Sequence, residues 1–167
     1  MIRSLAGAGL GLALLGFPFL AGCNTSSPAP FRAEEVLNSG VVTLSGANEV
    51  PPITTTATGS FTASLNVTQR SLTITGSFSG LTGDLFPIGT FGPAHVHEGA
   101  AGTNGPVAFS LLVTPDATGR NGTFSLVAQD LTQEQIEEFR EGLYYVNIHT
   151  TTFNSGELRG QITFPAP

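Results

Sequence analysis

Hydrophobic residues alternate with Ser and Thr along much of the chain after residue 40. The alternation is regular in residues 61–67 and again in residues 72–78, with a short polar turn at residues 68–71 between them. A period of two is typical of a strand with one buried and one solvated face, so these runs predict a β-hairpin. Gly76 interrupts the second run and indicates a bulge or a close approach by a neighbouring segment.

Five more apolar runs have the length of strands and are bounded by turn-forming residues. They cover residues 41–44, 107–113, 124–128, 144–149 and 157–164. About seven or eight short strands at regular spacing predict one all-β domain, either a two-sheet sandwich or a flattened barrel.

One segment carries helical signals instead. Thr132 is a good N-cap, and Gln135 stands at the capping-box position three residues later. Leu131 and Ile136 are placed to form a hydrophobic staple around this cap, and Gly142 is a suitable stop. We expect one short helix that connects two strands and plugs one end of the sheets.

The first 22 residues have the parts of a secretion signal in order. Arg3 supplies a positive charge, residues 5–20 are apolar, and small residues follow. The apolar run is shorter than a typical transmembrane helix and is interrupted by Gly16 and Pro18. Residues 1–22 are therefore predicted to be a signal peptide.

The tetrapeptide Leu20-Ala21-Gly22-Cys23 resembles the lipobox of bacterial lipoproteins. In that family the cysteine takes a diacylglyceryl group and becomes the new N-terminus, which implies lipidation at Cys23 and a membrane anchor. The alternative is an ordinary signal peptide that is cleaved near Ala21. The lipobox favours a location at the cell envelope, in the periplasm or at the cell surface.

Residues 23–40 are predicted to join this anchor to the domain. The Ser/Pro-rich stretch at residues 24–30 cannot bury enough apolar area to fold, so we expect a flexible tether. The folded domain is then expected over residues 41–167.

Charge is scarce, and its balance excludes some partners. After residue 22 the chain has twelve carboxylates, five arginines and no lysine, which is a formal charge of −7. An acidic domain without lysine has no patch to neutralise phosphates, so nucleic acid is not an expected partner. Cys23 is the single cysteine, so a disulfide within the chain is excluded.

Several separate stretches together resemble one known domain. They are residues 44–52 (LSGANEVPP), 94–99 (AHVHEG), 104–107 (NGPV), 131–142 (LTQEQIEEFREG), and 145–150 with 156–160 (YVNIHT and GELRG). In this order and spacing they resemble the CHRD domain, named after the animal protein chordin and also present in bacterial exported proteins. The resemblance covers Val41 to about Phe164. It implies an immunoglobulin-like or superoxide-dismutase-like Greek-key β-sandwich and no particular reaction.

All three histidines of the chain lie in two of these stretches. His95 and His97 stand two residues apart in a predicted strand, so their side chains point to one side while Val96 points into the core. His149 lies on the polar face of a late strand and has the parity to join them. Three neutral imidazoles without thiolates suit Cu(II) or Zn(II), and the affinity order favours copper. We predict a copper site at His95, His97 and His149, with zinc as the alternative metal.

The tetrad His95-Val96-His97-Glu98 also resembles the copper-ligand strand of Cu/Zn superoxide dismutases, and His149 resembles that family's last copper histidine. The chain departs from that family because it has no bridging histidine, no His/Asp cluster for zinc and no disulfide. The resemblance therefore implies copper binding and does not extend to dismutation.

A structural role for the histidines is the alternative. His95 and His149 would then organise the end of the sheet by hydrogen bonds to Glu98, Glu157 or Asn147, and the same groups would support the ligands if metal were bound.

Other constellations are weaker. Residues 99–105 are rich in glycine but lack the Lys-Ser/Thr of a phosphate loop, so we interpret them as a loop between strands. Glu157 and Arg159 share a predicted strand face and are expected to form an exposed ion pair. No residue is assigned to catalysis or to an organic cofactor.

Three functions stay open at this point. The first is a lipid-anchored protein that binds copper through three histidines. The second is a non-catalytic structural or adhesive module of the cell envelope, and the third is an enzyme like superoxide dismutase. The sequence indicates no particular protein partner.

Overall fold

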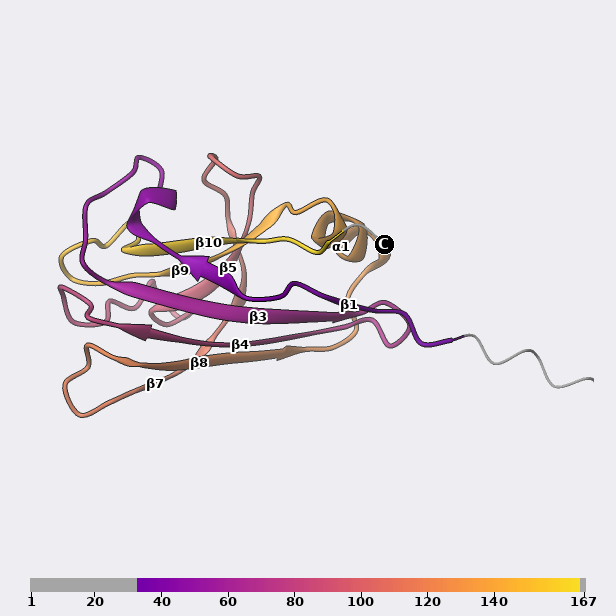
Figure 1. Cartoon of the computed structure of the whole chain (residues 1–167), viewed down its shortest axis with the longest axis horizontal. Coiled ribbons are helices and arrows are strands. Elements are labelled where there is room, and N and C mark those ends of the chain that lie inside the picture. Colours follow the sequence, from indigo (N-terminus) through magenta and orange to yellow (C-terminus); the bar gives the residue numbers. More distant parts are fainter. Residues whose placement is uncertain (1–32, 166–167) are drawn as a thin grey trace, which may run out of the picture. The chain divides into compact units, whose positions relative to one another are not determined.

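The computed structural model describes residues 33–165. Within this range, ten strands form two antiparallel sheets that share one hydrophobic core (Figure 1). The prediction of an all-β sandwich with one short helix is confirmed.

The larger sheet has the strand order β1-β3-β4-β8-β7, and β2 also pairs with β3. Its strands are β1 (Val36–Asn38), β2 (Val42–Leu44), β3 (Thr58–Asn66), β4 (Ser71–Ser79), β7 (Leu112–Pro115) and β8 (Gly122–Ala128). The smaller sheet has the order β10-β9-β5-β6. Its strands are β5 (Ala94–Glu98), β6 (Val107–Ser110), β9 (Tyr144–Ile148) and β10 (Leu158–Ile162).

The predicted hairpin is formed by β3 and β4, whose nine residues pair in register. Gly76 lies where β8 crowds the hairpin. A Cβ at this position would stand 2.3 Å from Cζ of Phe124 and 2.6 Å from the carbonyl oxygen of Ser60. The close approach that the glycine indicated is therefore confirmed.

The core lies between the inner faces of the two sheets and follows the alternation of the sequence. The larger sheet contributes Leu44, Phe61, Ala63, Leu65, Leu72, Ile74, Phe78 and Phe124, and the smaller sheet contributes Ala94, Val96, Tyr144, Val146, Ile148, Leu158 and Ile162. Burial of these side chains is the main contribution to the stability of the fold. The residues between them along the smaller sheet point to its outer face, where the three histidines lie.

The run at residues 107–113 differs from the prediction of a single strand. It divides into β6 in the smaller sheet and β7 in the larger one, so the chain crosses the sandwich at Leu111. Leu111 is 4% exposed, and its N–H donates to the carbonyl oxygen of Ala94 at 3.0 Å. The local pattern does not reveal this break, because both halves of the run have the alternation of a strand.

The helix α1 (Gln133–Arg140) has the predicted cap. The hydroxyl of Thr132 accepts from the N–H of Gln135 at 3.1 Å, and the N–H of Thr132 donates to Oε1 of Gln135 at 2.9 Å. Phe139 packs on Tyr144 with 4.0 Å between ring centroids. The helix therefore covers one end of the smaller sheet, as expected.

The N-terminal side of the domain begins earlier than Val41. The strand β1 lies in the stretch that we expected to be tether, and it pairs with β3. The predicted signal peptide, Cys23 and the Ser/Pro-rich stretch at residues 24–30 lie outside the described residues. Within residues 33–165, no helix is both long and apolar enough to span a membrane.

Candidate metal centre

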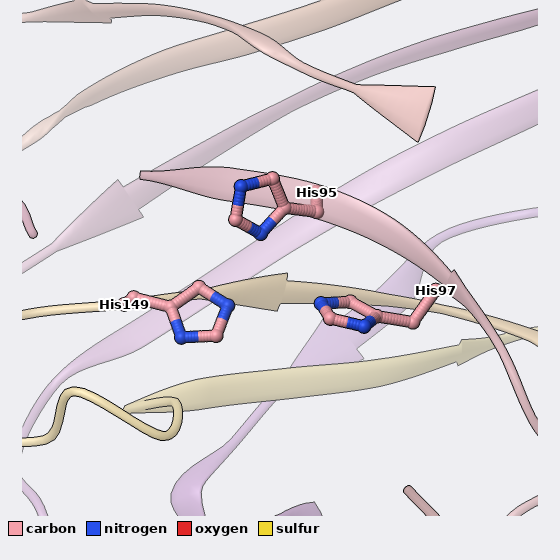
Figure 2. Close-up of side chains that lie close together, drawn as sticks. All are labelled: His95, His97 and His149. Carbon is pink, nitrogen blue, oxygen red and sulfur yellow. The ribbon is translucent and has the colours of Figure 1, made fainter. Parts of the chain in front are cut away.

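Two neighbouring strands bring the three histidines together on the outer face of the smaller sheet (Figure 2). His95 and His97 lie on β5, and His149 follows the last residue of β9. The N–H of His149 donates to the carbonyl oxygen of Pro93 at 2.8 Å, which continues the β5–β9 pairing beyond the strands. The strand parity inferred from the sequence is confirmed, and Val96 is fully buried in the core.

The rings are close enough to share one ion. Their centroids lie 5.5 Å apart for His95 and His97, 5.0 Å for His95 and His149, and 5.9 Å for His97 and His149. One nitrogen from each ring lies within 4.8 Å of the other two. Nitrogens that bind one ion at about 2.0 Å lie roughly 3.3–3.5 Å apart, so small side-chain rotations close the cluster around an ion.

Each ring is held from its far side by a backbone carbonyl. Nε2 of His95 bonds to the oxygen of Gly92 at 2.8 Å. Nδ1 of His97 bonds to the oxygen of Gly105 at 3.0 Å, and Nδ1 of His149 bonds to the oxygen of Asn154 at 3.1 Å. The structural alternative expected His95 and His149 to bond to Glu98, Glu157 or Asn147. This expectation is wrong, because their partners among the described residues are the carbonyl oxygens of Gly92 and Asn154.

These bonds set the tautomer of every ring. A carbonyl oxygen accepts only, so the nitrogen that faces it carries the hydrogen, and the other nitrogen of a neutral ring keeps a lone pair. Those other nitrogens are Nδ1 of His95, Nε2 of His97 and Nε2 of His149. Within the described part of the chain, all three are buried and have no hydrogen-bond partner.

The surroundings keep the rings neutral. The side chains of His95, His97 and His149 are 0%, 9% and 4% exposed. Burial, and after it the neighbouring His95, lower the pKa of His149 to about 4. Burial also lowers the pKa of His95 and of His97, although their hydrogen bonds to carbonyls work in the opposite direction. Neutral imidazole is the form that binds a metal ion.

An aromatic and a cationic side chain are stacked behind His97. The ring of Tyr145 lies parallel to the His97 ring, with 5.0 Å between centroids and 5° between planes. The guanidinium carbon of Arg159 lies 3.4 Å from the centroid of Tyr145 on its β10 side. We call these three side chains the His97–Tyr145–Arg159 stack. A cation over an aromatic face is favourable, so the stack is stabilising in itself.

Arg159 also ties down the loop at residues 99–105. Its guanidinium donates to the carbonyl oxygens of Ala100 at 3.2 Å and Thr103 at 2.7 Å, and to Oδ1 of Asn104 at 3.2 Å. The same loop supplies the Gly105 carbonyl that holds His97. Arg159 therefore supports the orientation of the His97 ring from two directions.

The prediction of an exposed ion pair between Glu157 and Arg159 is wrong. Both side chains are buried, at 0% and 1% exposure. Glu157 instead accepts from the hydroxyls of Thr55, Thr82 and Thr150, at 2.7, 2.9 and 2.7 Å. Loops from distant parts of the chain cover this end of the sheet, so the exposed surface that the sequence suggested does not exist.

A second buried carboxyl group lies near the cluster. Glu49 is 5% exposed, and its Oε2 accepts from Nδ2 of Asn147 at 3.2 Å. Oε1 of Glu49 and Oδ1 of Asn147 are buried acceptors without a partner among the described residues. Burial raises the pKa of Glu49 to about 7, and the bond from Asn147 and the charge of Arg159 only partly offset this.

Sequence reasoning did not single out Tyr145, Arg159 or Glu49 as parts of the site. Strand parity places Tyr145 on the same face as His149, so the sequence contained a signal that Tyr145 lies beside the site. Arg159 and Glu49 depend on pairing between distant segments. The residue that follows β2, Ser45, exchanges both backbone hydrogen bonds with Arg159, which brings Glu49 to the smaller sheet.

A cavity of about 440 Å³ lies beside the stack. It is lined by Ala47, Asn48, Glu49, Val50, Pro52, Ala101, Gly102, Arg159 and Gln161. None of the three histidines lines it, so the cavity and the histidine cluster are separate features of the outer face.

The fold and the site together define a β-sandwich with a buried three-histidine cluster on one outer face. The sequence profile of the CHRD domain matches residues 41–162, which include all three histidines. The chain therefore belongs to the CHRD family, and the resemblance seen in the sequence is confirmed. No curated protein and no solved structure matches the chain.

Proposed function

We propose that this CHRD-domain protein binds one copper ion through His95, His97 and His149. The observation that carries the proposal is the set of three buried imidazole nitrogens that face one another without a partner. A buried polar atom left unpaired costs about 1–3 kcal/mol, and one ion satisfies all three at once.

The far-side hydrogen bonds support a metal site over a purely structural cluster. Histidine ligands in metal sites characteristically donate their second N–H to a carbonyl or carboxylate, which fixes the ring orientation. All three rings have this arrangement here. A structural cluster has no reason to leave three lone pairs facing one another.

Copper fits the donor set best. Imidazoles bind copper and zinc well, and among divalent ions the affinity order favours copper. The likeness of residues 95–98 to the copper-ligand strand of superoxide dismutases supports the same choice. Bound copper supplies tight coordination and one-electron exchange. The chain supplies three neutral rings, fixes their orientation and excludes water.

Metal titration of the purified full-length protein in detergent tests this function. We expect one equivalent of copper to bind by isothermal titration calorimetry, and the His97→Ala variant to lose this event. Glu98→Gln is the matched control, because Glu98 is exposed on the same strand and bonds to none of the histidines. Absence of any metal binding, or equal binding by His97→Ala, would refute the assignment.

The proposal extends to the location of the protein. The lipobox-like residues 20–23 support export, lipidation at Cys23 and anchoring at the cell envelope. Two or three acyl chains anchor a protein stably, whereas one chain binds reversibly. Mass spectrometry of the N-terminal peptide is expected to find acyl chains on Cys23. The Cys23→Ser variant is expected to lack them and to leave the membrane fraction; an unmodified Cys23 would contradict the anchor.

A further inference from the structure

The charge of the site bears on which ion it prefers. The cluster consists of three neutral imidazoles, with no carboxylate or thiolate among the grouped ligand atoms. A bound Cu(I) ion therefore leaves the site with one positive charge, and Cu(II) or Zn(II) leaves it with two. Imidazole binds all three ions, so donor type alone does not decide between the monovalent ion and the divalent ones.

Burial of the site makes a divalent ion less favourable than a monovalent one. The three rings are at most 9% exposed, so a bound ion loses most of its contact with water. The cost of transferring an ion from water into a medium of low dielectric grows with the square of its charge, so a divalent ion bears about four times the cost of a monovalent ion of similar size. Within residues 33–165, the cluster includes no negatively charged ligand that would offset this cost.

Arg159 adds to the effect. Arg159 is 1% exposed, its guanidinium carbon lies 3.4 Å from the centroid of the Tyr145 ring, and the His97 ring stacks on the same Tyr145 ring at 5.0 Å. Water does not screen this positive charge well at such burial. It repels a divalent ion about twice as strongly as a monovalent one. The bonds from Arg159 to the loop at residues 99–105 hold the charge in place.

Two buried carboxyl groups lie in the same region without joining the cluster. Glu157 accepts three threonine hydroxyls and a backbone N–H, and Glu49 bonds to Asn147. Neither belongs to the group of ligand atoms, so neither compensates the charge of the ion by coordination.

We infer that the three-histidine site selects monovalent copper over divalent copper and zinc, and that Arg159 strengthens this selection. The inference rests on the proposed function, because it requires that the site binds metal. It identifies the cargo as Cu(I), held in a neutral and water-poor three-nitrogen site.

Competition titrations on the full-length protein in detergent test the selection. Under anaerobic reducing conditions, Cu(I) is titrated against a chromophoric Cu(I) chelator, and the dissociation constants for Zn(II) and for Cu(II) in air are measured separately. We expect Cu(I) to bind about a hundredfold or more tightly than Zn(II) and Cu(II), given the difference in desolvation cost. Equal or tighter binding of either divalent ion would overturn the inference while leaving a metal-binding function intact. Absence of binding by all three ions would refute the proposed function itself.

Arg159→Met tests the second half of the inference. Methionine keeps a long apolar side chain over Tyr145 and removes the charge, and Arg120→Met is the control at a partly exposed arginine that pairs with Asp84. In folded Arg159→Met protein we expect the preference for Cu(I) over Zn(II) to fall by about tenfold, with no change in Arg120→Met. An unchanged preference in the folded variant would show that Arg159 does not contribute to the selection of Cu(I). If the variant does not fold, the wild-type dissociation constants still decide the selection.

Discussion

Glu49 is a buried carboxyl group whose ionisation opposes folding. Burial raises its pKa from the ordinary 4.5 to about 7. A carboxyl group with a raised pKa in the folded state is ionised more readily in the unfolded chain. Below pH about 4.5, Glu49 is protonated in both states and the folded protein bears no ionisation penalty. The stability of the fold relative to this limit falls as the pH rises from about 4.5 to about 7.

The size of the effect follows from the pKa. Each pKa unit corresponds to about 1.4 kcal/mol, so a rise from 4.5 to about 7 lowers the free energy of unfolding by about 3 kcal/mol above pH 7. Glu49→Gln removes the ionisation and keeps the shape of the side chain, and its amide oxygen still accepts from Asn147. We predict that Glu49→Gln is about 3 kcal/mol more stable than wild type at pH 8 and equally stable at pH 4.

The stability of Glu49→Gln and of wild type is measured by urea unfolding of the metal-free proteins from pH 4 to pH 8.5. Unfolding is followed by far-UV circular dichroism. The quantity of interest is the difference between variant and wild type at each pH. This difference cancels the contribution of the three histidines, which has the opposite sign: their pKa values are lowered, so they stabilise above pH about 6.5 and lose that contribution as the pH falls.

Glu98→Gln, at an exposed position on β5, serves as the control and is expected to change the free energy of unfolding little. If Glu49→Gln changes stability equally at every pH, the effect comes from packing and not from ionisation. A variant that is less stable than wild type at pH 8 would refute the reasoning outright.

Three further predictions concern the site, the helix cap and the close approach in the larger sheet. Copper at 100 times its dissociation constant is expected to raise the free energy of unfolding by about 2.7 kcal/mol; thermal melts should show a rise in Tm for wild type and none for His97→Ala. Thr132→Ala removes the N-cap of α1 and is expected to lower the free energy of unfolding by about 1 kcal/mol, so an unchanged urea midpoint would contradict the role of the cap. Gly76→Ala places a methyl group 2.3 Å from the Phe124 ring and is expected to cost about 1–3 kcal/mol in urea unfolding, whereas Ser77→Ala at the exposed neighbour is expected to change little.

Local rules predicted the parts of the fold that depend on neighbours in the sequence. Alternation located the β3–β4 hairpin, and the cap of α1 could be identified from Thr132 and Gln135. Gly76 indicated a close approach before its partner was known. These features are local because a strand face or a helix cap is defined by residues two to four positions apart.

The same rules failed where distant segments decide the outcome. The break between β6 and β7 is invisible in a run that alternates throughout. The ion pair expected for Glu157 and Arg159 assumed an exposed strand face, which loops from other parts of the chain cover. Burial of a side chain depends on everything packed against it, and sequence spacing does not contain that information.

The histidine cluster divides along the same line. The sequence by itself determined that His95 and His97 share a strand face, that His149 has the parity to join them, and that the donors are imidazole nitrogens with no thiolate beside them. Only the tertiary structure decided that one nitrogen of each ring lies within 4.8 Å of the other two, that three carbonyls hold the far sides of the rings, and that Arg159 packs on the Tyr145 ring beside His97. The physical reason is that pleating fixes the direction of a side chain locally, whereas convergence, burial and neighbouring charge arise from the pairing of strands and loops far apart in the chain.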